Sequence, residues 1–485
     1  MTLLTASDIA VGDGASTLLA PLSLYLDPGE ALVILGETGS GKSLMAQALM
    51  GTLPPELTAR GRVTIGAQTF DPASPERFRK LWGRQIGVLP QEPWLSLDPL
   101  MRAREQIAEA HALVRGLSRA DARRRASADL AAMGLKGAEQ AYPHELSGGM
   151  AQRVVIAAAR AGGARIVIAD EPTKGLDAAR RDDVADLLLS EMGQDGGLLV
   201  ITHDLTLARR MGGRMIVLRS GEVVESGATE EIFAVPQTAY TRDLFAADPE
   251  RWKPRPRSIR SEPSVVQVRD LSVARGGRTL FSDISFDLTP GGIVGVTGPS
   301  GCGKSTLGDA VLGLIPLASG SVSRPAQQAP FAFQKLYQDP VAAFPRKQTL
   351  GRTITDTAAL CGGRSDLIDG LLDRLGLNPV LLDRRPGAVS GGELQRLSLL
   401  RVLLRRPSLI FADEPTSRLD PITQAKVIGL LTDTARDDGV ALMLVSHDPH
   451  LVRNTAQEVI ALGAPATPGD SRAAAPGSCL APTAS

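Results

Sequence analysis

Short apolar runs alternate with amphipathic stretches in both halves of the chain, a pattern typical of parallel α/β folds. In the first half, residues 31–35 predict a strand that leads through a glycine-rich loop into a helix over residues 43–50. Residues 293–297 and 306–314 repeat this order in the second half. Other apolar runs predict buried strands that end in an acidic pair or just before a histidine, at residues 165–169, 198–202, 409–412 and 441–446.

The chain contains an internal repeat of about half its length. Matched motif positions pair Lys42 with Lys304, Gln91 with Gln338, Ser147 with Ser390, Asp170 with Asp413 and His203 with His447. A spacing this long indicates duplicated domains rather than a solenoid of short units. We therefore expect one domain over residues 1–248 and a second, with a shortened C-terminus, over residues 264–463.

Two segments outside these domains differ in composition from the rest. Residues 249–263 are rich in proline and arginine, which disfavours a helix or a central strand and predicts a semi-rigid linker. Residues 464–485 are rich in Ala, Pro, Gly and Ser and predict a disordered tail.

Composition narrows the class of protein. Of the 485 residues, 43% are hydrophobic and 22% are charged, and 53 basic residues balance 53 acidic ones, which argues against a general coat for nucleic acid. The uncharged run Leu288–Gly303 is too short and too rich in glycine for a membrane span, and the first ten residues do not resemble a secretion signal. Three scattered cysteines fit a reducing compartment better than a disulfide framework.

Two glycine-rich loops fit the P-loop pattern, in which backbone amides, a lysine and a helix N-terminus surround phosphate groups. We expect Lys42 and Lys304 to reach the β- and γ-phosphates of ATP, and the hydroxyls of Ser43 and Ser305 to bind Mg²⁺. The predicted ATP-binding residues of the loops are Gly36, Glu37, Thr38, Gly39, Ser40, Gly41, Lys42 and Ser43, and Gly298, Pro299, Ser300, Gly301, Cys302, Gly303, Lys304, Ser305 and Thr306.

An apolar run ends in an Asp-Glu pair at the matched position of each half. Asp170 and Asp413 are suited to hold Mg²⁺ through water, and Glu171 and Glu414 to polarise the attacking water. A solvated strand end is the alternative for one such run. Its recurrence downstream of both P-loops favours the catalytic interpretation.

A histidine follows a predicted strand in each half. One such histidine is usually structural, but the matched positions of His203 and His447 favour a γ-phosphate sensor that aligns the attacking water. The predicted catalytic residues are therefore Glu171, His203, Glu414 and His447.

Two Ser-Gly-Gly segments complete the set: Ser147, Gly148 and Gly149, and Ser390, Gly391 and Gly392. Each alone is a plausible helix N-cap turn. Together with the P-loop, glutamine, Asp-Glu pair and histidine in the same order, they resemble the signature of ABC ATPases over most of residues 1–463. The resemblance implies an α/β fold of two P-loop NTPase ABC-type nucleotide-binding domains in tandem. Each would have a parallel-sheet core, an antiparallel β portion and a helical subdomain.

The resemblance also implies head-to-tail pairing of the two domains around two ATP molecules. Each P-loop would face the Ser-Gly-Gly turn of the other half, so that ATP closes both composite sites and hydrolysis opens them. On this basis Gln91 and Gln338 join Ser43, Asp170, Ser305 and Asp413 as Mg²⁺-binding residues, and Asp177 and Asp420 join the ATP-binding set. Since both sites are complete, we expect both to hydrolyse ATP.

The chain departs from the family pattern at two places. The first acidic pair is followed by Lys174-Gly175-Leu176-Asp177 instead of the more usual Ser-Ala-Leu-Asp type. In addition, the positions around Val11 and Ala274, upstream of the P-loops, hold no aromatic residue to stack on adenine.

Five segments resemble the ATPases of peptide and nickel importers: Leu53–Pro55, Gln91–Pro99, the signature Ser147–Met150, Glu231–Thr241 and Gln338–Pro345. This resemblance implies import of oligopeptides, dipeptides, nickel or metal chelates. The implied partners are two integral-membrane permease subunits and an extracytoplasmic solute-binding protein. The chain would lie peripherally on the cytoplasmic face of the inner (plasma) membrane, and no nucleic-acid partner is expected.

Two other functions stay open at this point. One is a tandem ABC ATPase that acts on ribosomes or DNA. The ribosomal type usually has a long basic helical arm between its domains, whereas residues 249–263 are few and contain helix-breaking prolines. The other is a phosphonate-processing ABC ATPase, whose motifs resemble the importer group.

Overall fold

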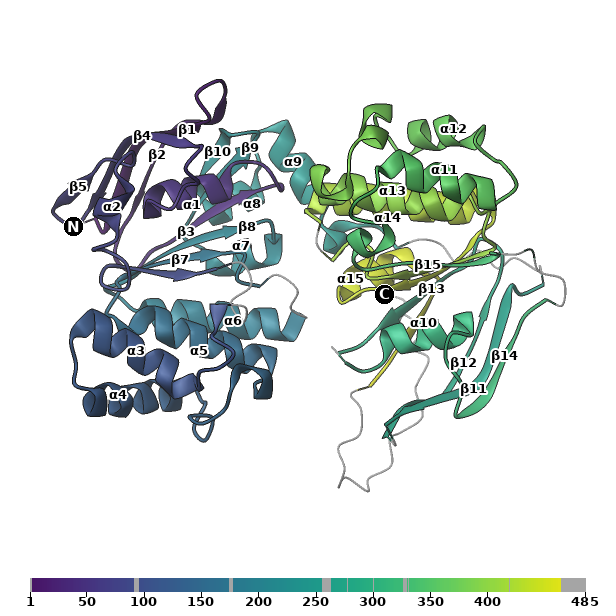
Figure 1. The fold of residues 1–485 in the computed structure, drawn as a ribbon, viewed down its shortest axis with the longest axis horizontal. Helices are drawn as coiled ribbons and strands as arrows, with labels where there is room; N and C mark the ends of the chain where they lie inside the picture. The colour runs from purple at the N-terminus through teal and green to yellow at the C-terminus, as the bar shows by residue number, and fades with distance from the viewer. Residues whose placement is uncertain are drawn as a thin grey trace. The chain divides into compact units, whose positions relative to one another are not determined.

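The computed structural model describes residues 2–90, 96–173, 178–254, 263–276, 278–299, 301–325, 329, 331–417 and 419–463. The chain divides into two compact units, Met1–Phe245 and Ala246–Ser485. Figure 1 shows the first unit in purple to teal and the second in teal to yellow.

The first unit contains two sheets and helices that pack against them. Its elements are β1 (Leu4–Gly12), β2 (Thr17–Leu26), β3 (Ala31–Gly36), α1 (Lys42–Met50), β4 (Thr58–Ile65), β5 (Gln68–Phe70), α2 (Pro75–Phe78), β6 (Ile86–Leu89), α3 (Ala103–Arg115), α4 (Arg119–Ala132), α5 (Gly148–Ala161), β7 (Ile166–Asp170), α6 (Ala178–Met192), β8 (Gly197–Thr202), α7 (Leu205–Met211), β9 (Arg214–Arg219), β10 (Glu222–Ala228), α8 (Thr229–Ala234) and α9 (Ala239–Ala246). The six-stranded sheet has the order β10-β9-β3-β8-β7-β6, and the four-stranded antiparallel sheet has the order β2-β1-β4-β5. All pairs of the larger sheet are parallel except β9 with β10.

The second unit repeats this architecture. Its elements are β11 (Val266–Arg275), β12 (Arg278–Leu288), β13 (Ile293–Thr297), α10 (Lys304–Leu312), β14 (Ser319–Ser323), β15 (Phe333–Leu336), α11 (Leu350–Leu360), α12 (Leu367–Arg374), α13 (Gly391–Leu403), β16 (Leu409–Asp413), α14 (Pro421–Asp438), β17 (Ala441–Val445), α15 (Pro449–Thr455) and β18 (Glu458–Ala461). The parallel sheet has the order β15-β16-β17-β13-β18, and the antiparallel sheet has the order β12-β11-β14.

In each unit a group of helices comes, along the sequence, after the helix that follows the P-loop and before the strand that leads into the Asp-Glu pair. In the first unit α3, α4 and α5 pack on one another, and in the second α11, α12 and α13 follow the same order (Figure 1). Parallel sheets, antiparallel sheets and helical groups thus occur in both units. The predicted fold class is confirmed.

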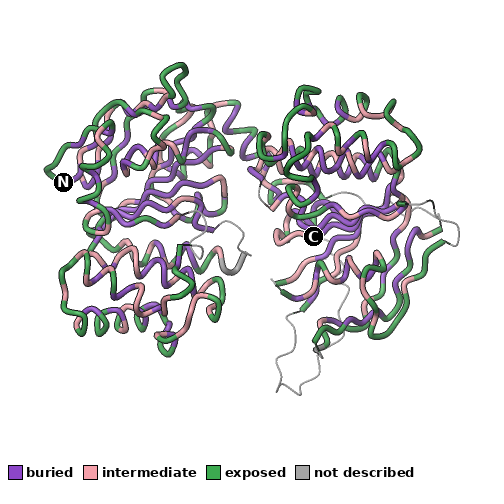
Figure 2. The backbone as a smooth tube through the Cα atoms, viewed as in Figure 1, coloured by how far each residue is buried: buried purple, intermediate pink, exposed green. Residues whose placement is uncertain are grey.

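The central strands are buried on both faces, as parallel strands covered by helices must be. Every residue of β3 and β8 is buried in the first unit, and every residue of β16 and β17 in the second. Figure 2 shows these strands in purple through the middle of each unit. This explains why the sequence shows continuous apolar runs here instead of alternating ones.

The predicted strand positions agree with the structure to within one residue. The run predicted over 165–169 is β7, that over 198–202 is β8, and those over 409–412 and 441–446 are β16 and β17. The β strand before each P-loop, β3 and β13, also matches its prediction. The helices after these loops begin at the P-loop lysines, slightly earlier than predicted.

The described beginning of the segment expected to be a linker is ordered against the second unit. Pro249–Arg251 form a 3₁₀ helix, and the buried side chain of Asn454 donates a hydrogen bond to the carbonyl oxygen of Pro249 at 2.8 Å. Trp252 packs against the apolar core of the same unit. A proline is tolerated here because it occupies the first position of the 3₁₀ turn, where its missing N–H is not needed.

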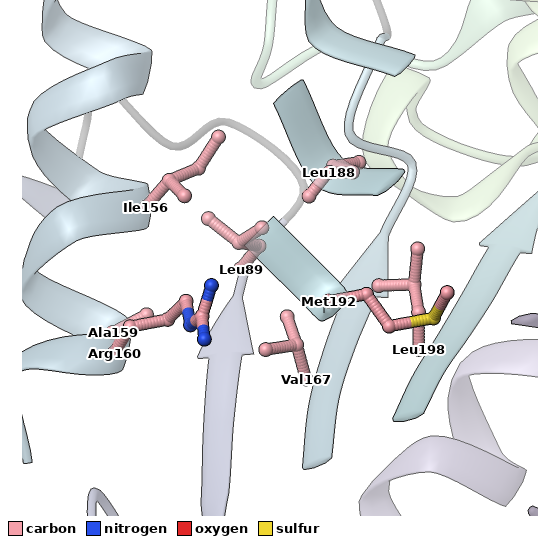
Figure 3. A pocket seen from close by; sticks show the side chains of 8 residues that line it. All are labelled: Leu89, Ile156, Ala159, Arg160, Val167, Leu188, Met192 and Leu198. Carbon is pink, nitrogen blue, oxygen red and sulfur yellow. The ribbon is translucent and has the colours of Figure 1, made fainter. Parts of the chain in front are cut away.

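A small apolar pocket lies in the first unit, between the larger sheet and helices α5 and α6 (Figure 3). It is lined by Leu89, Ile156, Ala159, Arg160, Val167, Leu188, Met192 and Leu198. None of these residues belongs to the predicted nucleotide motifs. The pocket is therefore separate from the site described next.

Candidate nucleotide site

The two P-loops connect a buried strand to a helix, β3 to α1 and β13 to α10. Gly39 and Gly41 have φ angles of 82° and 99°, and Gly301 and Gly303 have φ angles of 81° and 102°. Residues with a side chain rarely adopt such angles, so these turns require glycine. The backbone can therefore curve at the N-terminus of a helix, where free N–H groups and the helix dipole favour an anion.

The P-loop lysines fold back over their own loops. Lys42 Nζ donates hydrogen bonds to the carbonyl oxygens of Gly36 and Glu37 at 2.7 and 2.8 Å. Lys304 Nζ makes the equivalent bonds to Gly298 and Pro299 at 2.8 and 3.0 Å. Both lysines are buried. Each ammonium group is therefore held beside the loop that is expected to carry phosphate.

A serine hydroxyl and an aspartate meet beside each P-loop. Ser43 Oγ donates to Asp170 Oδ2 at 3.1 Å, and Ser305 Oγ donates to Asp413 Oδ1 at 2.9 Å. Burial raises the pKa of the Asp413 carboxyl, although Ser305 and Lys335 act in the opposite direction. Hydroxyl and carboxylate oxygens are ligands that Mg²⁺ prefers when nucleotide phosphates complete its shell. These residue pairs fit a Mg²⁺ ion.

In the first unit, Glu171 and His203 form a close pair. His203 Nδ1 lies 2.7 Å from Glu171 Oε1, while Glu171 Oε2 accepts from the Thr202 hydroxyl at 3.3 Å. Burial by itself would raise the pKa of the Glu171 carboxyl, but the hydrogen bond and charge of His203 and the charge of Lys42 hold it below its ordinary value. The carboxylate therefore stays ionised at neutral pH, as a general base must be.

In the second unit, Glu414 has two partners from other elements. His447 Nε2 lies 2.5 Å from Glu414 Oε1, and Gln338 Nε2 donates to Glu414 Oε2 at 2.8 Å. The other ring nitrogen of His447 lies 3.3 Å from Lys304 Nζ. A carboxylate, a histidine and a P-loop lysine are thus connected in one network.

The backbone at both glutamates has the same unusual conformation. Glu171 and Glu414 have φ angles of 49° and 47°, in the left-handed region that residues with a side chain seldom adopt. Each backbone N–H is bonded to the neighbouring strand, at Ile201 O and Val445 O. Such strain is often found where a side chain must be aimed at a functional site.

The Ser-Gly-Gly turns are helix N-caps, as the simpler interpretation of the sequence suggested. Ser147 Oγ accepts from the N–H of Met150 at 3.4 Å at the start of α5, and Ser390 Oγ accepts from the N–H of Glu393 at 3.3 Å at the start of α13. Ser147 and Ser390 are both exposed within their own units. A cap of this kind leaves free N–H groups at an accessible helix start, which suits it to bind a phosphate.

Three predicted site residues, Gln91, Asp177 and Ser300, lie outside the described residues. Of their described counterparts, Gln338 contacts Glu414 as stated above. Asp420 is buried and caps helix α14, since its Oδ1 accepts from the N–H of Thr423 at 2.9 Å. The structure thus shows Asp420 in a helix-capping position.

Two contacts with predicted site residues were not expected from the sequence. Tyr240 on α9 is buried, and its hydroxyl accepts a hydrogen bond from the backbone N–H of Glu37 at 3.3 Å. Lys335 on β15 lies beside Asp413. A charged residue within a short, partly buried strand was the available signal for Lys335. Tyr240 gave no signal beyond its place in the segment Glu231–Thr241.

Comparison with known proteins finds the same family in both halves of the chain. The ABC transporter family profile matches residues 19–174 and 281–417. The peptidoglycan transport ATP-binding protein YejF of Agrobacterium fabrum is 34% identical over 95% of this chain and 91% of its own length. The glutathione import ATP-binding protein GsiA of Salmonella typhimurium is 33% identical over 90% of this chain and 80% of its own.

Among solved structures, an RNase-L inhibitor matches 91% of this chain and 85% of its own with a TM-score of 0.62. An archaeal ribosome recycling factor, in complex with a ribosomal stalk protein, matches 94% and 87% with a TM-score of 0.64. Both are 21% identical to this chain, so these matches show a shared fold alone.

Proposed function

The chain belongs to the ABC transporter family of ATP-binding proteins and is an ATPase, and from this premise we propose that it energises an importer of peptide-containing cargo. The names of two relatives, which refer to peptidoglycan transport and glutathione import, support a peptide-type cargo over nickel. The recurrence of the Ser–Asp and Glu–His pairs beside both P-loops carries the ATP-hydrolysing part of the proposal. The import part is carried by the two transport relatives, which match nearly the whole chain.

We assign the site residues by these contacts. Lys42 and Lys304 bind the β- and γ-phosphates. The Ser–Asp pairs would hold Mg²⁺, which would supply positive charge against the negative charge that develops on the phosphates. Glu171 and Glu414 polarise the attacking water in the two sites. His203 and His447, which contact these carboxylates, hold them in place and sense the γ-phosphate.

The two nucleotide-binding domains, residues 1–248 and 264–463, are proposed to pair head to tail. Exposed Ser-Gly-Gly turns support this, because a cap with free N–H groups can bind the γ-phosphate held by the opposite P-loop. ATP then bridges the two domains and closes both sites. Hydrolysis removes the bridge, so that chemical energy becomes domain movement.

A pair of exposed leucines supports docking to two membrane permease subunits. Leu113 on α3 and Leu360 on α11 have exposed fractions of 73% and 72%, in the helical group of each unit. They occupy equivalent positions, because both are 22 residues beyond the glutamines Gln91 and Gln338. Within the described part of the chain, none of the helices has the length and hydrophobicity that a transmembrane span requires. We propose that the permeases, with a separate solute-binding protein, supply the membrane path and the chain binds them peripherally.

Action on ribosomes or DNA is a weaker candidate. The structural likeness to the archaeal ribosome recycling factor extends to the fold only. The sequence relatives, which match nearly the whole chain at a higher identity, are transport ATP-binding proteins. None of the matches described above supports a phosphonate-processing activity.

The proposal predicts that the chain is required for uptake and that both leucines are required for coupling. A strain without the chain should fail to import at least one member of a labelled panel that contains a peptidoglycan peptide, glutathione, dipeptides and nickel. When the double variant Leu113→Asp, Leu360→Asp is returned to this strain, it should not restore uptake. The purified double variant should keep its basal ATPase activity within about twofold, because both residues are surface-exposed. Val235→Asp is the matched control, because Val235 is also exposed, at 65%, and lies outside the helical group.

Normal uptake of the whole panel without the chain would contradict the transport proposal. Sedimentation of the ATP-bound chain with ribosomes would then favour the alternative.

A further inference from the structure

The two units differ in the residues that surround the aspartate proposed to bind Mg²⁺, which is Asp170 in the first unit and Asp413 in the second. Strand β15 pairs with β16 in the same register in which β6 pairs with β7, so that Lys335 lies beside Phe411 where Val88 lies beside Ile168. A charged residue of the second unit therefore takes the place of an aliphatic one in the first.

Lys335 is a largely buried cation with acidic partners. Its Nζ lies 2.7 Å from Asp309 Oδ1 and 3.5 Å from Asp413 Oδ2, and its side chain is only 13% exposed. The ammonium group also lies 5.2 Å from the centre of the Phe411 ring, within the range of a cation–π contact. Since Ser305 donates to Asp413 Oδ1, hydrogen-bond donors face both oxygens of this carboxylate.

The neighbouring helix has changed together with the strand. Asp309 on α10 corresponds to Gln47 on α1, because both lie five residues after the P-loop lysine. Gly308 corresponds to Ala46 in the same way. A Cβ atom on Gly308 would lie 2.0 Å from the ring of Phe411, so the larger ring requires glycine at this position. Four positions thus differ as a set: Lys335, Asp309, Gly308 and Phe411 replace Val88, Gln47, Ala46 and Ile168.

We propose that Lys335 makes the two nucleotide sites unequal by competing with Mg²⁺ for Asp413. This rests on the proposed role of Ser305 and Asp413 as Mg²⁺ ligands. A buried ammonium group beside a metal-binding carboxylate offsets part of the negative charge that attracts the ion and repels the ion directly. Asp309 balances the charge of Lys335, but the ammonium group of Lys335 still lies 3.5 Å from Asp413 Oδ2. The second site therefore gains less nucleotide affinity from Mg²⁺ than the first.

The alternative is a purely structural role, in which Lys335 only neutralises Asp309. The two roles differ in one measurable quantity, the factor by which Mg²⁺ increases nucleotide affinity at a given site. By linkage this factor reports the coupling between metal and nucleotide. A structural defect changes affinity with and without Mg²⁺ alike and leaves the factor unaltered.

The test uses the full chain with one site disabled at a time, by Lys42→Ala or Lys304→Ala. Calorimetry then gives the affinity for a non-hydrolysable ATP analogue at the remaining site, in Mg²⁺ and in EDTA. We expect the Mg²⁺ factor of the second site to be on the order of tenfold smaller than that of the first. Lys335→Val with Asp309→Gln, which installs the residues of the first unit, should bring the factor to within about twofold of the first site.

The reciprocal change is the matched control: Val88→Lys with Gln47→Asp should lower the Mg²⁺ factor of the first site. Equal factors at the two native sites, or an unchanged factor after the paired substitution at Lys335, would overturn the proposal. A Mg²⁺ factor of one at both sites would contradict the assignment of Ser43, Asp170, Ser305 and Asp413 as metal ligands, and the inference with it. Transport is not part of this test, so its outcome is independent of the cargo.

Discussion

Changing Glu171 and Glu414 together to glutamine is expected to lower ATP turnover by roughly 10²–10⁴ while ATP binding is retained. The reason is the loss of the only carboxylates that contact the strand-end histidines, at 2.7 and 2.5 Å, among the described residues. Glutamine has nearly the same shape, so the hydrogen bonds of Thr202 and Gln338 can be kept or reversed. Steady-state kcat and calorimetric ATP affinity, measured on the same preparation, separate the two effects.

Conservative changes elsewhere serve as controls for this experiment. Glu109→Gln and Asp369→Asn alter exposed carboxylates in the helical group of each unit and should leave turnover unchanged. Each single variant, Glu171→Gln or Glu414→Gln, tests whether both sites hydrolyse ATP. If the double variant turned over ATP at the native rate, neither glutamate would be the base.

Replacing Lys42 and Lys304 together by alanine should abolish detectable ATP binding, a loss of at least about 100-fold in affinity. Each ammonium group is buried and held over its loop by two backbone carbonyls, next to the expected phosphates. Replacing the lysine removes a charge-assisted contact to phosphate. It also removes the two hydrogen bonds from the lysine to the carbonyl oxygens that hold the loop in place. Calorimetry with ATP measures the result directly.

Lys136→Ala and Lys426→Ala are the controls for the lysine experiment, since each removes an exposed lysine, one in each unit. Circular dichroism of the double P-loop variant verifies that the fold persists. A folded double variant that still binds ATP with native affinity would remove these lysines from the nucleotide site.

Most of the fold was predictable because local patterns determine it. Continuous apolar runs such as those of β8 and β17 require burial on both faces, which places them in a parallel sheet covered by helices. The P-loop glycines at positive φ then determine where the backbone of each unit turns from its strand into the following helix. The same topology explains why Ser43 meets Asp170 and Ser305 meets Asp413, since the carboxyl ends of parallel strands share one edge of the sheet.

The contacts that were not predictable depend on distant residues. Tyr240 reaches the N–H of Glu37 across 203 positions of sequence, and no periodic pattern reports such a contact. The sequence also does not reveal that Gly308 and Phe411 in the second unit stand where the first unit has Ala46 and Ile168 as a matched pair. Each of these residues alone is ordinary in its helix or strand. Only their packing shows that glycine is needed where the ring lies. The 3₁₀ turn at Pro249–Arg251 was likewise hidden, because its order comes from the contact with Asn454.

The measurement that tests the central claim most directly is the structure of the Glu171→Gln, Glu414→Gln chain with ATP and Mg²⁺. If each ATP is shared between the two halves, Ser390 will lie against the γ-phosphate at Lys42, and Ser147 against the γ-phosphate at Lys304. ATP bound at both P-loops, with the two Ser-Gly-Gly turns facing solvent and touching no nucleotide, would contradict the account.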